Sequence, residues 1–553
     1  MDSGTRMVLA LALSFVVFMT YQFFFGKPPQ PPVDQQAQME QQVRQDETVA
    51  EDENIQPIEA EHAHPAAKPV LKGRKLTVST PLYNASFRED GAVLTHFELK
   101  KYHQDIQPDS PFQVLTDAKS SNESDLSIGF VNHGIQGLND AVFQADTDAH
   151  NIDVSHKSKT LSFSWTSSEG YRITKIFTFY PDSYAFDLVV KIGNPFANPL
   201  KDKLTLALTY HDTFAKKSRY TFSGPSILID NRLEELSEKD ISKTKVYPGN
   251  VEWMALGDRY FMSAIIPDVE SSKASVLLEH EPGEILKAFY VDPADTIPAK
   301  AERSYRYKVY MGPKSLDILS ATDKKLAKAV DFGWFDIIAK PLLHALNFFN
   351  RYVHNYGIAI IILTILIKAA FWPLSNKSYK SMSEMKKLQP KMQELRQKYK
   401  GEKQKMNQEL MNLYKTYNIN PLGGCLPMVL QIPVFFAFYK MLYQCIELRH
   451  QPFFGWITDL SAPDRLFRFD FSVPLMDPPY GIPVLTIIMG ASMFLQQKMS
   501  PPPGDPSQAK LMMILPIVFT FIFINFPSGL VLYWFVNNIL SISQQYYITK
   551  KTA

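Results

Sequence analysis

The sequence predicts an α-helical membrane protein with six spans that also carries a large extracytoplasmic antiparallel β-sandwich domain. Three observations support this fold class. Six apolar segments of fourteen to twenty-one residues occur, one at the amino terminus and five in the last two hundred residues. Between about 76 and 310, apolar and polar residues alternate with the period of β-strands. Two blocks of opposite charge flank these regions and indicate the orientation of the chain in a membrane.

Composition excludes several classes of protein. The chain has 553 residues, of which 45% are hydrophobic, and a formal net charge of +2. This near-zero charge gives no support to binding of nucleic acid or another polyanion along the whole chain. With 24 glycines and 2 cysteines, the sequence is neither collagen-like nor a disulfide scaffold.

The first apolar segment, 7–25, carries no charge and is long enough to span a bilayer. A cleaved signal peptide is the alternative, but the segment ends in three phenylalanines, where a peptidase needs small residues. We therefore expect a signal anchor over 1–26. The following 27–72 is rich in proline, glutamine and acidic residues, and 26–71 has three basic and nine acidic residues, which predicts a disordered tether.

The alternating pattern predicts a β-sandwich over 73–318, on the outer side of the membrane; a periplasmic location is what the resemblance described below implies. Leu161, Phe163 and Trp165 alternate with polar residues, and a second alternating run follows the turn residues 168–170, with Ile173, Lys175, Phe177 and Phe179 on one face. The seven histidines of this region show no metal-ligand spacing, and no catalytic Ser, His and acid set can be assigned. A binding or spacer role is favoured over an enzyme, and neither a cofactor nor a metal is expected.

An amphipathic helix is predicted over 332–352. Phe335, Ile338, Leu342, Leu346 and Phe349 recur at helical spacing, and charged or polar residues occupy the opposite face. Such a helix is typical of one that lies on the outer membrane surface. The alternative is a helix packed on the sandwich.

A five-span core is predicted over 353–549, with spans at about 357–372, 426–446, 480–495, 511–526 and 529–542. The segment 373–424 contains eleven basic and four acidic residues, a net charge of +7. Short basic loops stay in the cytoplasm. Counting spans from this loop also places both chain termini in the cytoplasm and the β-domain outside.

Polar side chains lie within the spans. Lys368, with Thr364 one turn earlier, falls in the cytoplasmic half of its span. An intramembrane ammonium costs about 3 kcal/mol and usually faces water or a partner. Snorkelling to the interface is an equal alternative for Lys368.

The last span is polar along one side. Tyr533, Asn537 and Ser541 recur at a spacing of four, with Trp534 and Asn538 beside them, and Gln431 adds an amide in another span. No acidic residue in the spans could pair with Lys368, which favours a hydrated recess around it. The amides could instead form hydrogen bonds between helices. We expect both the recess and such bonds.

Two further features concern the membrane and its inner face. The spans at 480–495 and 529–542 are shorter than the roughly 20 residues of a normal span, which indicates local thinning of the bilayer.

The basic loop predicts a helical hairpin over 376–418, with a stripe that includes Met382, Met385 and Met392 beside Lys386 and Lys387. Methionines adapt to varied apolar surfaces, so the hairpin is either a landing site for hydrophobic segments or packs its methionines on itself.

Four motifs carry a resemblance to a known family. They are W-P-L-S at 372–375, N-P-L-G-G-C-L-P at 420–427, Q-I-P-V-F-F-A-F-Y at 431–439 and F-P-S-G-L-V-L-Y-W at 526–534. With these motifs the chain resembles the YidC/Oxa/Alb family of membrane protein insertases in its Gram-negative form. The resemblance covers about 335–549 by motif and nearly the whole chain by the order of its parts.

The resemblance implies a membrane protein insertase and chaperone of the bacterial inner membrane that uses no nucleotide and performs no covalent chemistry. A substrate helix would enter a hydrophilic, positively charged groove open to cytoplasm and lipid, with or without the general translocon. The implied groove residues are Lys368, Thr364, Gln431, Tyr533, Trp534, Asn537 and Asn538. Implied partners are nascent membrane proteins, the ribosome, the secretion translocon and lipids, without nucleic acid as a specific ligand.

Further implications concern the outer domain and two departures from the family pattern. The five spans would form the insertase core, and the outer domain would resemble a supersandwich of sugar-binding ancestry. Relatives usually carry Arg at the position of Lys368 and often Tyr at that of Trp534. The first change keeps the charge but loses the bidentate fork of the guanidinium.

Two other functions remain open from the sequence. A secondary transporter could use Lys368 as a substrate or proton site, but it would need inverted repeats, which are not evident. Alternatively, the outer domain could be an enzyme or carbohydrate binder that the spans anchor.

Overall fold

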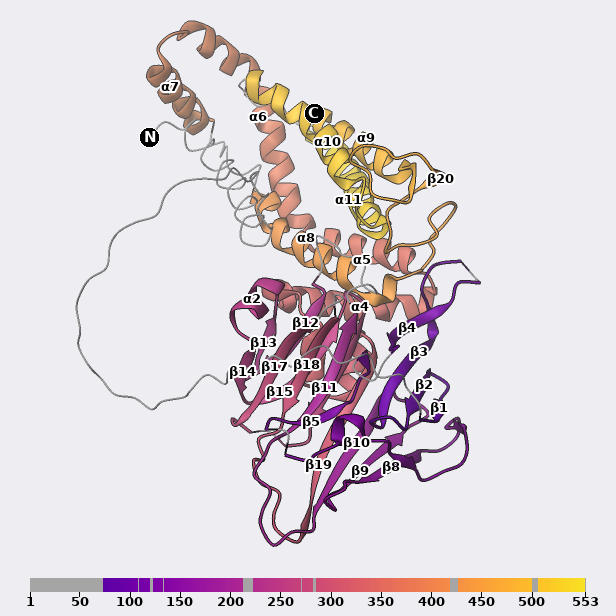
Figure 1. The fold of residues 1–553 in the computed structure, drawn as a ribbon. Helices are drawn as coiled ribbons and strands as arrows, with labels where there is room; N and C mark the ends of the chain where they lie inside the picture. Colours follow the sequence, from indigo (N-terminus) through magenta and orange to yellow (C-terminus); the bar gives the residue numbers. More distant parts are fainter. Residues whose placement is uncertain are drawn as a thin grey trace, which may run out of the picture. The chain divides into compact units, whose positions relative to one another are not determined.

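The computed structural model describes residues 73–107, 109–119, 123–132, 134–211, 222–269, 271–281, 285–417, 426–499 and 506–552 (Figure 1). The predicted signal anchor over 1–26 and the tether over 27–72 lie outside the described residues. The same is true of 418–425, which holds most of the N-P-L-G-G-C-L-P motif.

The first part of the described chain is rich in β-strands, as predicted. Its described residues form one nine-stranded sheet and two five-stranded sheets. In spatial order, the nine-stranded sheet consists of β13 (Arg232–Glu235), β12 (Gly224–Ile229), β15 (Val251–Gly257), β16 (Phe261–Pro267), β19 (Ala301–Pro313), β10 (Ala185–Asn194), β9 (Arg172–Phe179), β8 (Lys159–Thr166) and β6 (Gln144–Ala145).

The two five-stranded sheets complete this β-rich domain. One consists of β4 (Phe112–Asp117), β3 (Val93–His103), β2 (Tyr83–Arg88), β1 (Lys75–Ser79) and β7 (Asn151–Asp153); the other of β14 (Val246–Gly249), β17 (Ala274–Glu281), β18 (Ile285–Val291), β11 (Leu204–His211) and β5 (Ile128–Phe130). Neighbouring strands pair antiparallel, with one correction to the prediction: β1 and β7 are parallel, with Val78 opposite Ile152. A parallel pair needs a long connection, and about seventy residues separate these two strands.

The strands predicted from alternation are present as β8 and β9. They pair with Leu161 opposite Phe177 and Trp165 opposite Ile173. Leu161 and Phe163 are fully buried, whereas the alternate residues of β8 are more exposed, because successive side chains of a strand point to opposite faces.

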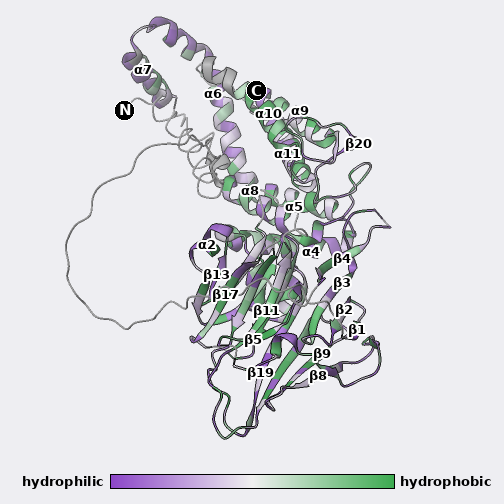
Figure 2. Ribbon diagram, viewed as in Figure 1, coloured by the Kyte–Doolittle hydropathy of each residue, from purple (hydrophilic) through white to green (hydrophobic). Residues whose placement is uncertain are grey.

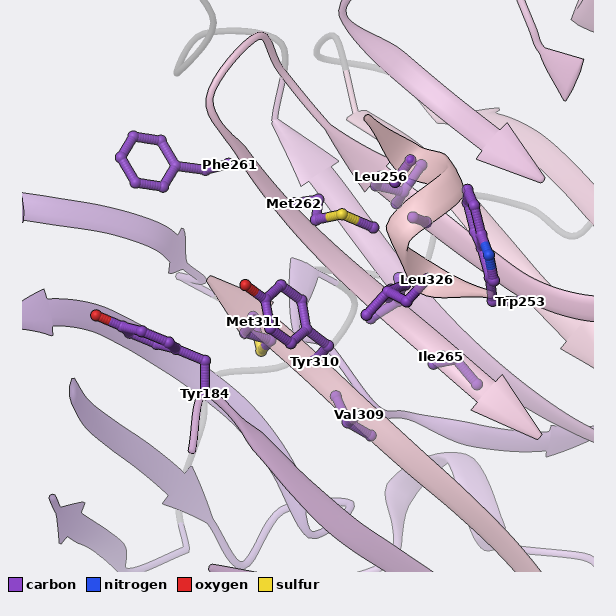
Figure 3. Packing of buried hydrophobic residues seen from close by; sticks show 14 of the residues in the cluster. Tyr184, Trp253, Leu256, Phe261, Met262, Ile265, Val309, Tyr310, Met311 and Leu326 are labelled. Atoms are coloured by element: carbon purple, nitrogen blue, oxygen red, sulfur yellow. The ribbon is translucent and has the colours of Figure 1, made fainter. Parts of the chain in front are cut away.

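Apolar side chains of the middle strands of the nine-stranded sheet pack into a dense core (Figure 3). Trp253 of β15 is fully buried, and its indole N–H donates to the Lys325 carbonyl at 2.9 Å. This bond connects the start of the short helix at Leu326–Ala329 to the sheet. On β19, Gly312 lies against Tyr184, where a Cβ would approach the ring to 2.9 Å. The aromatic ring thus fills the space that a side chain would need.

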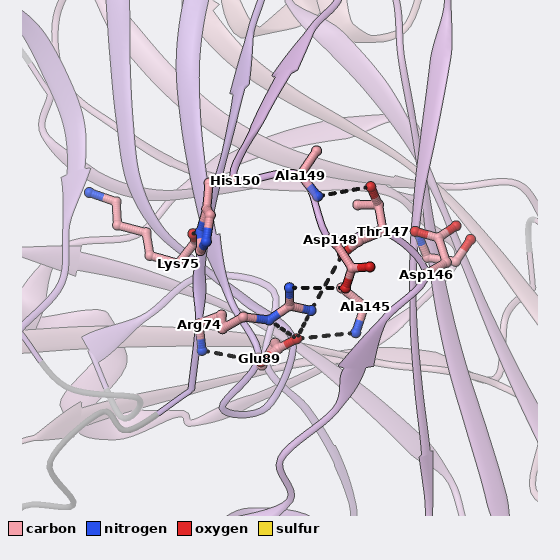
Figure 4. Close-up of polar contacts among 10 residues, drawn as sticks. Arg74, Lys75, Glu89, Ala145, Asp146, Thr147, Asp148, Ala149 and His150 are labelled. Carbon is pink, nitrogen blue, oxygen red and sulfur yellow. Dashed lines mark hydrogen bonds and ion pairs between the residues drawn. The ribbon is translucent and has the colours of Figure 1, made fainter.

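A partly buried ion pair fixes the beginning of the domain (Figure 4). The Arg74 guanidinium donates to Glu89 Oε1 at 2.7 Å, and the backbone N–H of Ala145 donates to the same oxygen at 3.3 Å. One carboxylate therefore joins the start of β1, the end of β2 and strand β6. Such shared acceptors are stronger than neutral hydrogen bonds because the acceptor is ionised.

A lysine lies on the inward face of β9. Lys175 is fully buried, and its Nζ donates to three backbone carbonyls, those of Ala92 at 2.6 Å, Leu126 at 2.7 Å and Gly91 at 3.2 Å. Burial lowers the pKa of this ammonium to about 7. Because three carbonyls match its three N–H groups, the lysine acts as a clamp between two turns.

A buried acid adjoins the same turn. Asp125 accepts hydrogen bonds from the Thr209 backbone N–H at 2.7 Å and from the Thr116 hydroxyl. Burial raises the pKa of this carboxyl to about 7, whereas an unfolded aspartate titrates near 4. The folded state therefore binds one more proton than the unfolded state between about pH 4 and 7.

We expect Asp125→Asn to remove a pH dependence of stability. Since the carboxyl's pKa is raised on folding, its contribution is complete below about pH 4 and is lost as the pH rises towards 7. From pH 4.5 to 6.5 the wild type should lose about 3 kcal/mol of unfolding free energy relative to the variant. Hydrogen exchange of the β3 and β11 amides in the full-length protein measures this difference; parallel pH profiles of the two proteins would contradict it.

Short helices connect the strands and lead to the helical part. The described residues include η2 (Leu138–Asp140), α2 (Glu238–Lys243), α3 (Leu316–Thr322), η4 (Leu326–Ala329) and η5 (Gly333–Phe335). The longer elements that follow are α4 (Asp336–Val353), α5 (Tyr356–Ala370), α6 (Trp372–Lys398), α7 (Lys403–Thr416), α8 (Leu426–Gln444), η6 (Ile446–Leu448), β20 (Leu466–Phe469), β21 (Tyr480–Ile482), α9 (Val484–Met499), α10 (Pro506–Phe523) and α11 (Ser528–Thr552).

Hydropathy separates these helices into two groups (Figure 2). Helices α6 and α7 are largely hydrophilic, whereas α5, α8 and α10 are apolar along most of their length. Helix α11 packs against α5, α6, α8 and α9, and α10 packs against α9. Helix α11 thus contacts four of the other helices.

Helix lengths bear on the predicted spans. Within the described residues, no single helix combines the length and the apolar composition that crossing a bilayer requires, although α5 and α6, bent by 65° from one another, meet both criteria as a pair. The helices occur at the five predicted places with different ends. The segment at 480–482 is a strand rather than the start of a helix. Helix α11 has 25 residues and continues about ten beyond 542, so the prediction of a short helix at 529–542 is wrong.

The predicted amphipathic helix corresponds to α4. Its buried side chains, Ala339, Leu343 and Leu346, face inward, and α4 contacts α5 and α8. The polar side meets α3, where Asn347 approaches Asp317. A second, exposed stripe is apolar and contains Ile337, Phe348 and Tyr352.

Helices α9 and α10 approach each other closely at a glycine. A Cβ on Gly490 would lie 2.0 Å from Thr520 Oγ1, well inside any permitted contact. The Thr520 hydroxyl is turned to its own helix and donates to the Pro516 carbonyl at 2.7 Å. Small residues allow helix backbones to approach in this way.

Candidate functional site

A cluster of polar side chains joins three helices around Lys368. From α5, Lys368 Nζ donates to Ser541 Oγ at 2.7 Å and to Asn537 Oδ1 at 3.3 Å, both on α11. From α8, Gln431 Nε2 donates to the same Asn537 oxygen at 3.1 Å. Asn537 thus accepts from two helices and connects the cluster.

Local sequence explains how the cluster forms. Asn537 and Ser541 are four residues apart, so they lie one above the other on the face of α11 that meets α5. Lys368 is in the last turn of α5, where the helix dipole favours a cation. The helical path of each segment therefore directs these groups to the same place.

The ammonium of Lys368 is nearly enclosed, with 7% of the residue exposed. It donates to a hydroxyl and an amide oxygen, and no ion pair involving Lys368 occurs among the described residues. These two neutral oxygens accept from the ammonium, which has three N–H donors, but leave its charge uncompensated. The cluster can therefore attract an anionic group.

Thr364 lies one turn before Lys368 and is also buried. Its hydroxyl donates to the Ile360 carbonyl of its own helix at 2.6 Å, so the structure does not join it to Lys368 by a hydrogen bond. Thr364 contributes a small polar surface rather than a ligand. A methyl group and a hydroxyl at this position leave more room than a longer side chain would.

Aromatic rings border the cluster on α8 and α11. Tyr533 is buried, stacks on Phe438 with ring centroids 4.4 Å apart, and its phenol lies near Gln431. Trp534 packs edge-on against Phe435 at 4.6 Å and against Phe523 of α10 at 4.8 Å. The two predicted aromatic residues thus share Phe435 as a neighbour, and Tyr533 is the one whose phenol adjoins the polar cluster.

Asn538 belongs to another helix contact. Its Nδ2 donates to Ser492 Oγ of α9 at 3.0 Å, so it links α11 to α9 and not to Lys368. Ser541, although part of the polar face of the last span, was not among the predicted site residues and is the nearest partner of Lys368. The spacing of four residues between 533, 537 and 541 already indicated that Ser541 shares a helix face with Asn537.

The hairpin of α6 and α7 has a core of its own. Leu388, Met392 and Leu410 are buried together, and Met385 packs against them. Met382 is half-buried outside this cluster, whereas Lys386 and Lys387 are exposed. The outer surface of the hairpin is consequently more basic than apolar.

The described part of these helices contains no metal-binding group beside the polar cluster. Among the described residues, no group of three or more His, Cys, Asp or Glu side chains could hold a metal ion. What the polar cluster offers is a fixed positive charge with hydroxyl and amide groups around it. Such a set can bind and orient polar peptide groups by electrostatic attraction and hydrogen bonds.

Two family models match the chain and together cover nearly all the described residues. The model described as YidC periplasmic domain matches residues 75–345, and the model described as 60Kd inner membrane protein matches residues 348–553. The β-rich domain and the helical part thus fall under separate models. The chain is accordingly a protein of the inner membrane with a periplasmic domain.

Full-length relatives agree with these models. The protein named Membrane protein insertase YidC from Syntrophobacter fumaroxidans is 42% identical, and that from Syntrophus aciditrophicus 43% identical, each over 99% of both chains. Among solved structures, an active YidC insertase crystal structure with the first transmembrane domain resolved is 18% identical over 87% of this chain and 95% of its own, with a TM-score of 0.37. From the two family models and the full-length sequence matches, the chain belongs to the YidC family of membrane protein insertases.

Proposed function

We propose that this protein inserts nascent membrane proteins into the inner membrane and assists their folding, through a hydrophilic groove that is open to cytoplasm and lipid. The observation that carries the proposal is the buried cation Lys368, held by Ser541 and Asn537 with no carboxylate among its partners. An uncompensated charge in a low-dielectric region attracts acidic residues of a substrate tail more strongly than it would in water. No nucleotide and no covalent step are required, since the substrate's hydrophobic segment gains free energy on entering lipid.

The proposed topology has six spans with both termini in the cytoplasm. The anchor would lie at 1–26, the tether at 27–72, the periplasmic β-sandwich at 73–318 and the five-span core at 353–549. Support for this orientation comes from the basic hairpin between α5 and α8, since positively charged loops remain inside. The exposed apolar stripe of α4 supports the proposal that 332–352 lies on the outer membrane surface.

Short helices support a thinned bilayer around the groove. Helix α9 has 16 residues and α5 has 15, so they extend about 24 Å and about 22 Å at 1.5 Å per residue. The hydrocarbon core of a typical bilayer is about 30 Å thick. A local reduction in thickness would shorten the apolar path that a polar substrate tail must cross.

The hairpin over 376–418 would meet partners on the cytoplasmic side. Its exposed Lys386 and Lys387 suit an anionic partner such as the ribosome, and the translocon is a second proposed partner. Met382 is available for contact with a hydrophobic nascent segment, whereas Met385 and Met392 contribute to the hairpin's own core. Lipids would cover the exposed apolar side chains of α9 and α10.

Crosslinking to a stalled nascent chain tests the groove. A photoreactive residue at Gln431, Asn537 or Tyr533 should form crosslinks to the substrate's hydrophobic segment in inner-membrane vesicles. The matched control is Leu495, an exposed position in the corresponding half of α9 that lies outside the polar cluster. Crosslinks from Leu495 that equal those from Gln431 and Asn537 would reject a groove at the cluster.

A further inference from the structure

A small hairpin with exposed apolar side chains lies between α8 and α9. Strands β20 and β21 pair with Leu466 opposite Ile482 and Phe469 opposite Tyr480. Phe467, Phe471 and Leu475 are 74%, 66% and 76% exposed. Large apolar side chains gathered in this way indicate a contact surface.

The base of this hairpin is held firmly by a buried arginine. Arg465 donates to the Pro479 carbonyl at 2.9 Å and to the Ile524 carbonyl at 2.8 Å, and so joins the strand β21 side to the end of α10. Its guanidinium also donates to Asn525 Oδ1 at 3.2 Å. The hairpin therefore has a fixed position relative to the turn between α10 and α11.

Asn525 completes this base. Its Nδ2 donates to the Leu475 carbonyl at 3.0 Å, and its oxygen accepts from the Asp477 N–H at 2.9 Å. The segment between the two strands is thus held by the same turn. The hydrogen bond to its carbonyl fixes the backbone of Leu475 in a position that leaves its side chain exposed.

Neighbouring helix surfaces continue the apolar patch. Strand β21 ends at Ile482 and α9 begins at Val484, with Ile482, Ile487 and Ile488 all exposed. On α10, Phe521 and Ile522 are exposed just before the turn that Arg465 contacts. In a protein of the inner membrane, exposed apolar helix surface faces lipid, and the hairpin extends that surface beyond the helix ends.

The side of the membrane follows from a contact with the periplasmic domain. Arg449, at the beginning of the same loop, donates to the His103 carbonyl of β3 at 2.6 Å. Strand β3 belongs to the part that matches the YidC periplasmic domain. The loop that carries the hairpin therefore lies on the periplasmic side, in agreement with the proposed topology on which this inference rests.

We propose that the β20–β21 hairpin inserts Phe467, Phe471 and Leu475 into the periplasmic leaflet of the bilayer. The insertion is shallow, because Arg468 and Asp470 lie between the apolar residues and remain exposed. The long stem of Arg468 can follow the apolar surface while its charge reaches the headgroups. The hairpin thereby fixes the depth of the outer ends of α9, α10 and α11.

Spin labelling in proteoliposomes tests the proposal with the full-length protein. In a background with Cys425→Ser and Cys445→Ala, a single cysteine replaces Phe471 or Leu475 and carries a nitroxide. The control is Val269→Cys, because Val269 of the periplasmic domain is 66% exposed, as Phe471 is. Collisions of the nitroxide with dissolved oxygen and with a water-soluble nickel chelate are then compared.

We expect the ratio of oxygen to nickel collisions to be at least several times higher at 471 and 475 than at 269, since oxygen concentrates in lipid. A double variant, Phe467→Asp with Phe471→Asp, should return the label at 475 to the ratio found at 269. Equal ratios at all three positions would overturn the proposal and would show that the hairpin is exposed to water. An immobile label that neither reagent reaches would overturn it in favour of protein, either the periplasmic domain or a second copy.

Insertion of a substrate by the same vesicles separates this inference from the proposed function. The labelled positions are outside the polar cluster, so insertion should proceed at the rate of the unlabelled protein. Vesicles that insert substrate but give an aqueous label refute only the hairpin proposal. Vesicles that give a lipid-exposed label but insert no substrate refute only the proposed function.

Discussion

Lys368→Ala should slow the insertion of substrates with acidic periplasmic tails about tenfold, while substrates with uncharged tails change by less than about twofold. A tenfold change requires about 1.4 kcal/mol, and two unit charges 4 Å apart interact by at most about 4 kcal/mol at an effective dielectric constant of 20. The charge of Lys368 is therefore sufficient for the effect. Insertion rates of paired substrates in proteoliposomes provide the measurement.

Two variants control for other effects of this substitution. Lys368→Arg keeps the charge and should retain most of the activity towards acidic tails. Lys440→Ala removes a lysine from α8, outside the cluster around Asn537, and should leave both substrates unaffected. If Lys368→Ala slows both kinds of substrate equally while the protein stays folded, attraction by charge is not the mechanism.

Lys175→Met should destabilise the β-rich domain by about 1–3 kcal/mol, the cost of leaving a buried acceptor without its donor. The substitution keeps the length of the side chain but leaves the carbonyls of Gly91, Ala92 and Leu126 without their donor in a buried region. Ala92 and Leu126 also have left-handed backbone conformations, with φ of 48° and 63°, which the bonds to Lys175 help to hold. Hydrogen exchange of the β3 and β9 amides in the full-length protein reports the loss.

The pH dependence of this effect has a definite sign. Because folding lowers the pKa of Lys175 to about 7, the unfolded chain binds more protons between about pH 7 and 10. Stability of the wild type therefore rises with pH in this window, and the deficit of Lys175→Met should grow. Lys159→Met, an exposed lysine on the neighbouring strand β8, should change stability by less than about 0.5 kcal/mol. Equal protection in the two variants would show that the three carbonyls do not depend on Lys175.

Local periodicity predicted most of the elements but not their contacts. The alternation around Phe163 and Phe177 predicted β8 and β9, because burial of one sheet face leaves a clear pattern. The same alternation placed Lys175 on the inward face without a reason for a cation there. Its partners at 91, 92 and 126 come from turns far away in the sequence, which periodicity cannot reveal.

The candidate site was predictable to a similar extent. Spacing of four along α11 indicated that Asn537 and Ser541 share a face, and a helical interior lysine indicated a polar neighbour. Which amide meets Lys368 depends on how α5, α8 and α11 pack, and so Asn537 and Asn538 could not be separated in advance. In the structure they face different helices, although they are adjacent in the sequence.

The glycine contact between α9 and α10 determines where the helices can part. At Gly490 the side chain of Thr520 lies so close to the backbone of α9 that it leaves no room for even a methyl group, so α9 and α10 are tightly packed at this point. If a substrate leaves the proposed groove sideways, we expect the helices to part along a seam other than this one. The seam between α8 and α11 is the alternative, since an entering polar segment could replace the hydrogen bond from Gln431 to Asn537 with its own, while the rings of Phe438 and Tyr533 would have to separate.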